Sequence, residues 1–352
     1  MANSAAVFLS SLFNIPNGIK KDEDLISLKD LYKRTNDKKI DYGTEGNFIQ
    51  ASDGTILFFQ PGVRKSLGYI AAEAPSTSSC PFKIWSTVTK NSTIAELPVV
   101  RNGNSLKIGQ FTIGQTELDR HAISSDFTKV LRYCKSLFSN PPEGGEGGLG
   151  APSIIRLAGS KFLITGGSIN CNYPTPEMLA LEKTATVFDA ETCTVINTFP
   201  LRSRRSRHQS RVLPSGKVLL IGSFTAAEPI EIINVEAGTS RYLNCQFDEK
   251  KECFTSLIDN QGNCYVIGGF NSETHTGAKT VEKIDMQREM IIEMPDLKLP
   301  RAFLGPGAPF HVQQCALVLT DNSILISGGR IKVMNPWGGK HNLTAEVYRT
   351  AN

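Results

Sequence analysis

The sequence has no apolar run that approaches the roughly 20 residues needed to cross a bilayer, so a membrane-spanning helix is not expected. Its amino terminus lacks the basic start of a secretory signal, and the apolar stretch there is interrupted by Ser10, Ser11, Asn14 and Pro16. These features predict a cytoplasmic protein with no membrane partner. For a chain from an intracellular microbe, the host cytoplasm is an equivalent location.

Several chemical signatures are also missing. The eight cysteines include no Cys-x-x-Cys pair, which favours free thiols in a reducing compartment over a disulfide framework. The five histidines are scattered without ligand spacing, so we expect no metal and no cofactor. Residues 145–150 read Gly-x-Gly-x-x-Gly, but prolines on both sides exclude the strand and helix that a dinucleotide site requires.

The charge is mild, with a formal net value of +4, and aromatic residues are not interleaved with the basic ones. Base stacking on aromatic side chains is a main source of affinity for single-stranded nucleic acids. Nucleic acid is therefore not the expected partner.

What the chain does contain is a recurring phrase: a turn residue, a short apolar run and a Gly-Gly-like pair. The copies occupy residues 160–167, 216–223, 262–269 and 322–329, and weaker ones lie at 54–61 and 103–110. Each apolar run is four or five residues long, which is too short for a helix and right for a buried strand. A repeat of this period predicts a series of similar sheets stacked on one another.

The surroundings of the phrase repeat as well. An alternating strand follows each glycine pair, as at 186–189 and 281–285, and then a further strand that ends in proline. Another strand, such as 209–213, opens the next unit. Four strands joined by short turns make one antiparallel blade.

Over residues 151–350 these features resemble the kelch repeat: the glycine pair, the aromatic–aspartate step at Phe188-Asp189 and a proline–arginine turn at Pro300-Arg301. The match is thin before residue 150, where Trp85 is the one candidate for the family's tryptophan. The resemblance implies an all-β, kelch-like β-propeller of six four-stranded blades, in a single domain over residues 1–352. Glycines near the axis would let strands approach closely. The structural repeat glycines are Gly166, Gly167, Gly222, Gly268, Gly269, Gly328 and Gly329.

Two expectations concern the ends of the chain. Residues 345–349 read as the third strand of the last blade, and we expect the apolar residues 5–9 to supply the missing outer strand and close the ring. Residues 21–35 carry leucines at helical spacing, with acids first and bases last, and predict a short helix laid against the propeller.

The densest charge lies in residues 202–208, in the loop after a proline-terminated strand. By the resemblance, such loops gather around the mouth of the central channel, where guanidinium groups would bind carboxylates or phosphates. A solvated basic loop with no ligand stays open as the alternative. The predicted binding residues are Arg101, Arg202, Arg204, Arg205, Arg207, His208 and Arg301.

We therefore expect a protein–protein interaction module that binds an acidic segment of a protein partner on this loop face, because variable loops on a rigid scaffold accumulate binding residues. The alternative is a sugar-active propeller enzyme, similar to the sialic acid mutarotases or the copper-dependent galactose oxidases of kelch type. A mutarotase would need acid–base groups in the channel. Catalytic residues are not identifiable from the sequence.

Overall fold

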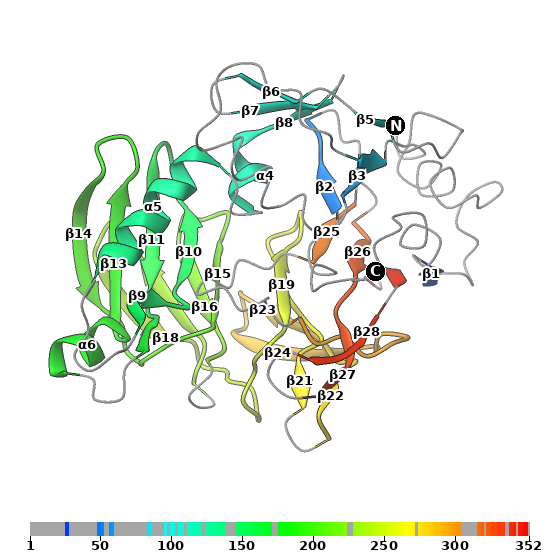
Figure 1. Cartoon of the computed structure of the whole chain (residues 1–352). Helices are drawn as coiled ribbons and strands as arrows, with labels where there is room; N and C mark the ends of the chain where they lie inside the picture. The colour runs from blue at the N-terminus through cyan, green and yellow to red at the C-terminus, as the bar shows by residue number, and fades with distance from the viewer. Residues whose placement is uncertain are drawn as a thin grey trace.

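The computed structural model describes the chain in segments, most continuously after residue 146. They comprise residues 25–27, 48–52, 56–59, 83–85, 95–96, 99–102, 105–108, 111–120, 124–137, 146–170, 175–223, 228–271, 274–303, 315–319, 322–334, 338–342 and 344–350. The architecture over these residues is all-β, with several four-stranded antiparallel sheets (Figure 1).

Between residues 153 and 294 three successive four-stranded sheets are simple meanders in chain order, which we number 3, 4 and 5. Sheet 3 contains β10 (Ser153–Arg156), β11 (Lys161–Thr165), β13 (Thr184–Asp189) and β14 (Thr194–Pro200). Sheet 4 contains β15 (Gln209–Val212), β16 (Val218–Ile221), β17 (Glu231–Asn234) and β18 (Thr239–Tyr242). Sheet 5 contains β19 (Thr255–Ile258), β20 (Cys264–Ile267), β23 (Val281–Asp285) and β24 (Met290–Met294).

Sheet 6 combines the two ends of the chain. It contains β25 (Ala316–Val318), β26 (Ile324–Ser327), β29 (Thr344–Tyr348) and, from the amino-terminal region, β1 (Leu25–Ser27). The helix predicted over residues 21–35 is therefore wrong at 25–27, where Leu25 pairs with Glu346 in an antiparallel ladder. The free edge of β29 offers these residues backbone hydrogen bonds, and such tertiary pairing overrides a weak helical pattern. Residues 5–9, predicted to fill this place, lie outside the described residues.

Earlier in the chain the sheets are smaller. Sheet 1 contains β2 (Phe48–Gln50), β3 (Ile56–Phe59), β4 (Lys83–Trp85) and β5 (Ala95–Glu96). Sheet 2 contains three strands: β6 (Val99–Asn102), β7 (Ser105–Ile108) and β8 (Phe111–Ile113). Arg101 lies within β6, where it pairs with Leu106. It therefore belongs to a strand and not to the inter-blade loop in which the sequence pattern placed it.

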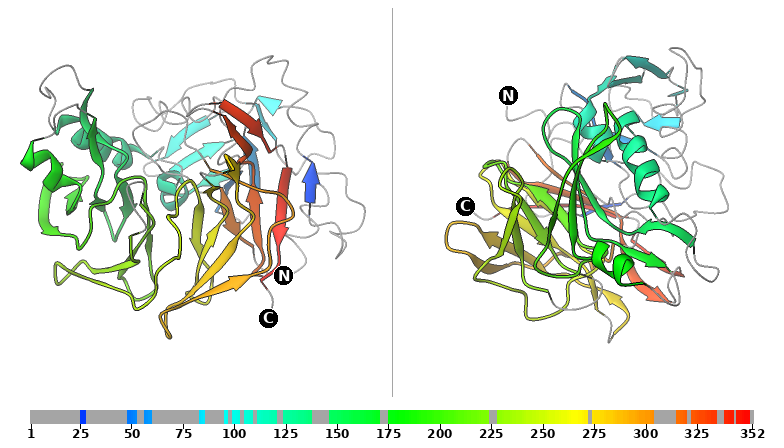
Figure 2. Two further views of the ribbon diagram at one scale, coloured as in Figure 1. Left: turned by 90° about the horizontal axis from the view of Figure 1, so that it is seen from below. Right: turned by 90° about the vertical axis from the view of Figure 1, so that its left-hand side faces the viewer.

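The core lies between the successive sheets 3 to 6, where the second strands β16, β20 and β26 are buried on both faces and β11 is buried over four of its five residues. All four residues of β16, β20 and β26 are buried, as continuous apolar runs predict. Leu163 of sheet 3 packs with Leu220 of sheet 4, Ile221 packs with Val266 of sheet 5, and Ile267 packs with Ile326 of sheet 6. The first strands β10, β15, β19 and β25 lie side by side. Figure 2 shows the sheets following one another from green to red, as the blades of a propeller do.

The other face of sheet 3 is covered by a helix. α4 (Gln115–Arg120) and α5 (Ser125–Ser136) follow β8, and the Ser124 hydroxyl caps α5 by accepting a hydrogen bond of 3.0 Å from the Phe127 N–H. Phe127 meets the ring of Phe162 edge to face, with centroids 5.9 Å apart. These helices were not predicted from the sequence.

A short helix and several short strands lie at the end of the sheets where the fourth strands finish. α6 (Pro176–Leu181) follows β12 (Ser168–Asn170), which pairs with β9 (Glu146–Gly150). A further sheet joins the loops of sheets 5 and 6. It contains β21 (Phe270–Asn271), β22 (Thr276–Gly277), β27 (Arg330–Met334) and β28 (Gly338–His341).

Candidate functional site

The basic loop between β14 and β15 alternates between buried and exposed side chains. Arg202, Arg204 and Arg207 are exposed, whereas Arg205 and His208 are completely buried. The arginines that looked equivalent in the sequence therefore do two different things in the structure.

Arg205 ties sheet 3 to sheet 4. Its Nε lies 3.2 Å from Glu231 Oε2 in an ion pair with no solvent exposure, and its Nη1 donates to the Gly222 carbonyl at 3.0 Å. Its Nη2 donates to the Pro229 carbonyl. Burial lowers the pKa of the guanidinium, and Glu231 opposes this shift. A buried charge is tolerated in this position because every side of the fork meets an oxygen.

At the next two junctions a basic side chain from the loop again pairs with a glutamate. Arg301 places Nη1 2.7 Å from the Gly328 carbonyl and Nη2 3.5 Å from Glu346 Oε2. Burial lowers the pKa of Arg301 to about 10, and Glu346 opposes this. Between sheets 4 and 5, Lys251 Nζ lies 2.9 Å from Glu282 Oε1. We call these three contacts the junction ion pairs.

The acidic partners hold one position in the repeat. Glu231, Glu282 and Glu346 stand on the third strand of their sheets, opposite Leu220, Val266 and Ile326 of the second strands. These glutamates were not identified from the sequence. The signal for them was an acid at a fixed step on the third strands of sheets 4, 5 and 6, which becomes meaningful once a base is known to lie beside it.

The backbone of the same loops accounts for the first glycine of three of the repeat pairs. A Cβ on Gly166, Gly222 or Gly268 would lie 2.1, 2.6 or 2.3 Å from a loop carbonyl oxygen, respectively that of Arg205, Lys251 or Arg301. The three glycines have φ values of 54°, 72° and 67°, a region that L side chains rarely adopt. The close approach is thus made by the loop that carries the base of the junction ion pair, and not by neighbouring strands at the axis as the sequence suggested.

The structure therefore corrects part of the predicted binding set. Arg205, Arg301 and His208 are interior residues and do not belong to an exposed binding surface. His208 Nε2 lies 2.8 Å from Thr165 Oγ1, which in turn lies 3.2 Å from Ser210 Oγ. These three side chains form a buried polar network beside the first strands.

Four exposed bases belong to this loop or lie next to it, and we call them the basic strip: Lys183, Arg202, Arg204 and Arg207. The Leu201 N–H donates to the Lys183 carbonyl at 2.9 Å, which brings Lys183 beside Arg202. The Arg207 N–H donates to the Ala151 carbonyl at 3.0 Å, next to the first strand of sheet 3. The basic strip therefore runs from the outer strand β14 inward to the first strands.

The basic strip differs from the corresponding loops at the neighbouring junctions. The loop between sheets 4 and 5 exposes Asp248 and Glu249, and the loop between sheets 5 and 6 exposes Asp296 and Lys298. One acid lies close to the basic strip, since Glu182 interacts with Arg204. Burial raises the pKa of Glu182 and Arg204 opposes this. Among these three loops, the first carries the concentrated positive charge.

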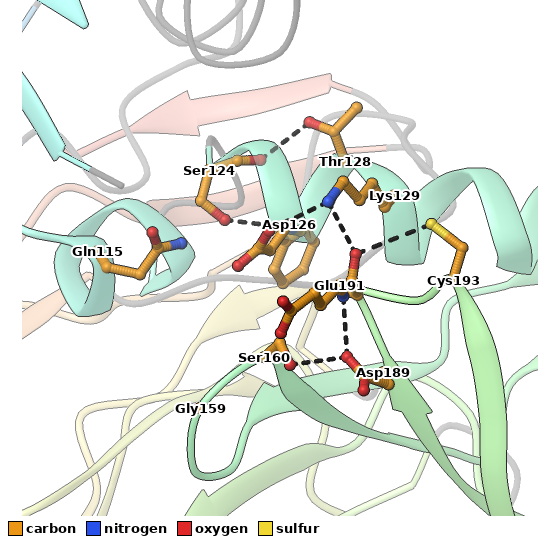
Figure 3. A network of polar contacts seen from close by, with 12 residues as sticks. Gln115, Ser124, Asp126, Thr128, Lys129, Gly159, Ser160, Asp189, Glu191 and Cys193 are labelled. Atoms are coloured by element: carbon orange, nitrogen blue, oxygen red, sulfur yellow. Dashed lines mark hydrogen bonds and ion pairs between the residues drawn. The ribbon is translucent and has the colours of Figure 1, made fainter. Parts of the chain in front are cut away.

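A second polar cluster lies at the opposite end of sheet 3, under α5 (Figure 3). Arg156 of β10 forms ion pairs with Asp119 and Asp126, the latter at 2.8 Å, and its guanidinium stacks 4.5 Å from the centre of the Phe162 ring. Burial raises the pKa of Asp119, while Arg156 and Ser124 oppose this.

Figure 3 also shows Lys129 of α5 between Asp126, 3.6 Å away, and the turn after β13, where its Nζ donates to the Ala190 carbonyl at 2.8 Å. Because the charges of this cluster face one another between the helices and the sheet, we interpret the cluster as the attachment of α4 and α5 to sheet 3.

Over the part of the chain that the structure describes, no group of three or more His, Cys, Asp or Glu residues could hold a metal ion. In the same residues no helix has the length and apolar character to cross a bilayer.

Comparison with known proteins gives little further guidance. No family model and no curated protein matches the sequence. One solved structure that matches, that of YjhT, aligns with a TM-score of 0.39 and 11% sequence identity, over 56% of this chain and 60% of that one.

Proposed function

We propose that this chain is a kelch-like propeller of six blades, closed by β1, that acts in the cytoplasm as a protein-binding module. The sheets that pack in chain order and the pairing of β1 with β29 support the closed ring. The basic strip is the proposed binding surface, and the proposed partner presents an acidic segment.

The observation that supports this proposal is that loop 201–208 contains both buried and exposed basic side chains. Its buried half fixes the backbone through the Arg205–Glu231 ion pair and a hydrogen bond of 2.8 Å from the Arg205 N–H to the Glu182 carbonyl. The exposed guanidinium groups therefore stand on a backbone that is already ordered. Preorganised arginines bind carboxylates with two parallel hydrogen bonds and lose less entropy on binding than a mobile loop would.

The enzymatic alternative is favoured by one feature, the His208–Thr165–Ser210 network beside the first strands. An acid–base residue in a mutarotase-like propeller has to meet its sugar. Because His208 has no exposed surface, this function would require the first strands to separate. We therefore place it second.

The test uses the full chain and a fluorescein-labelled hexaglutamate peptide, with binding followed by anisotropy at low salt. The double variant Arg204→Glu/Arg207→Glu should bind about tenfold more weakly, a change of roughly 1.4 kcal/mol. Arg288→Glu is the matched control, because Arg288 has a side chain that is 75% exposed and stands in a turn at the opposite end of the sheets. Equal binding by the wild type and the double variant would contradict the proposal.

A further inference from the structure

The basic strip is short and runs from the outer strand of a sheet toward the inner strands. Arg202 and Arg204 are two residues apart, so their Cα atoms are separated by at most about 7 Å, and Arg207 lies at most about 11 Å beyond. A four-stranded sheet is roughly 14 Å wide from its outer to its inner strand, since neighbouring strands are about 4.8 Å apart. The basic strip thus crosses one junction radially over about that distance.

The surface around the basic strip does not suit a helix. Helical partners dock through several apolar side chains on one face, in a groove lined with hydrophobic residues. Of the large hydrophobic residues exposed in the described part of the chain, Tyr242 is the one tied to this loop. An extended segment needs no groove, and side chains on one of its faces recur about every 6.7 Å. That spacing suits the first two arginines.

Tyr242 marks the outer end of the basic strip. Its hydroxyl lies 2.5 Å from Ser203 Oγ, and Arg202 Nε donates to the nearby Ser240 carbonyl at 3.1 Å. Tyr242 is 38% exposed although its hydroxyl is held in place. A fixed aromatic ring offers apolar contact at a low entropic cost.

The neighbouring loop restricts the direction of binding. Asp248 and Glu249 are exposed at the next junction, where they would repel an acidic segment lying around the circumference. A segment lying along the radius avoids them.

Resting on the proposed function, we propose that the partner segment is extended and lies radially along the basic strip, with acidic residues at alternate positions and an apolar residue packed on Tyr242. The chemistry required is that of an acidic peptide of about five residues with one apolar end.

The experiment compares peptides of identical composition and length on the full chain. In one, leucine is followed by three aspartates at alternate positions. In the other, three neutral residues separate successive aspartates. The alternating peptide should bind at least about fivefold more tightly, because all three carboxylates reach the basic strip together. Equal binding of the two peptides would overturn the extended register while leaving an acidic partner intact. Failure of both to bind would instead overturn the proposed function.

The apolar end is tested with Tyr242 variants. Tyr242→Ala should weaken the leucine-ended alternating peptide about fivefold and leave a serine-ended version unchanged. Tyr242→Phe keeps the ring without its hydroxyl and should retain at least half of the affinity. Met290→Ala, at an exposed apolar residue of β24, is the matched control and should change nothing. An equal effect of Tyr242→Ala on both peptides would overturn the assigned contact, and thermal unfolding of each variant checks that it is folded.

Discussion

Sheet 3 and sheets 4 to 6 have the same strand order. They differ in what packs on the face of each sheet that points toward the preceding part of the chain. Sheets 4, 5 and 6 each receive a basic side chain from the preceding loop, which meets a glutamate on the third strand. Sheet 3 has Thr186 at that position, opposite Ile164, and its face is packed against α5. A junction ion pair is present at each place where one of these sheets packs on the next. At sheet 3, on which a helix packs, Thr186 occupies the position of the glutamate.

This difference shows that the repeat is maintained by contacts at the junctions as well as by apolar strands. The apolar runs are alike in all four sheets and would allow several ways of stacking. A buried base has a single acceptable location, since any other would leave its charge without an oxygen acceptor. We infer that the junction ion pairs set the angle at which each loop enters the next sheet.

The largest effect is expected from breaking the most buried junction ion pair. Glu231→Leu leaves Arg205 charged and buried, and should lower the free energy of unfolding by about 4 kcal/mol. The double variant Arg205→Met/Glu231→Leu should recover most of the loss. Thr186→Val at the equivalent position in sheet 3 is the control and should cost about 1 kcal/mol or less.

Denaturant unfolding measures these stabilities, and hydrogen exchange locates the change in β16 and β17. If Glu231→Leu proved no more damaging than Thr186→Val, the buried ion pair would have no special role in the repeat.

The packing of α5 on sheet 3 is tested by removing the Phe127 ring. Phe127→Ala should cost about 3 kcal/mol, because the ring is 1% exposed and packs on Phe162. The increase in hydrogen exchange should centre on α5 and sheet 3, and sheets 5 and 6 should keep their protection. Uniform loss of protection in all sheets would show that α5 is coupled to the whole structure rather than to one face.

The sequence predicted the part of this architecture that depends on local pattern. The buried runs of β16, β20 and β26 are each specified by a few neighbouring residues, and they were identified correctly. β1 was not, because three residues with a helical pattern pair with a strand more than 300 positions away. α5 was not predicted, although Phe127, Val130 and Cys134 recur at helical spacing, because this segment lies outside the strand repeat on which the predicted fold was based.

The candidate site was harder to predict for the same reason. Whether an arginine is buried depends on a distant acid: Arg205 meets Glu231 from 26 positions away and Arg301 meets Glu346 from 45. A run of bases in a loop therefore contains no local sign of which ones point inward. That Arg204 is exposed and Arg205 is buried becomes clear only when the third strand of the next sheet, which carries Glu231, is in place.

The smallest expected effect concerns pH, and it separates two glutamates of sheet 5. Burial raises the pKa of Glu282 above its usual value of 4.5, while Lys251 opposes this. A raised carboxyl pKa means that the folded state holds this proton more tightly than the unfolded state does. The contribution of Glu282 to stability is therefore greatest below pH 4.5 and declines as the pH rises through its folded value.

Glu289 behaves in the opposite way, because Arg241 and the Asn244 N–H lower its pKa. Its contribution is present above pH 4.5 and is lost as the pH falls through the folded value. Unfolding of Glu282→Gln and Glu289→Gln, followed between about pH 3.5 and 7, should show this contrast. Relative to the wild type, Glu282→Gln should lose stability as the pH falls, and Glu289→Gln should lose stability as it rises. Parallel pH profiles for the two variants would mean that the partly exposed Lys251–Glu282 pair behaves as a surface contact, unlike the buried pairs on either side of it.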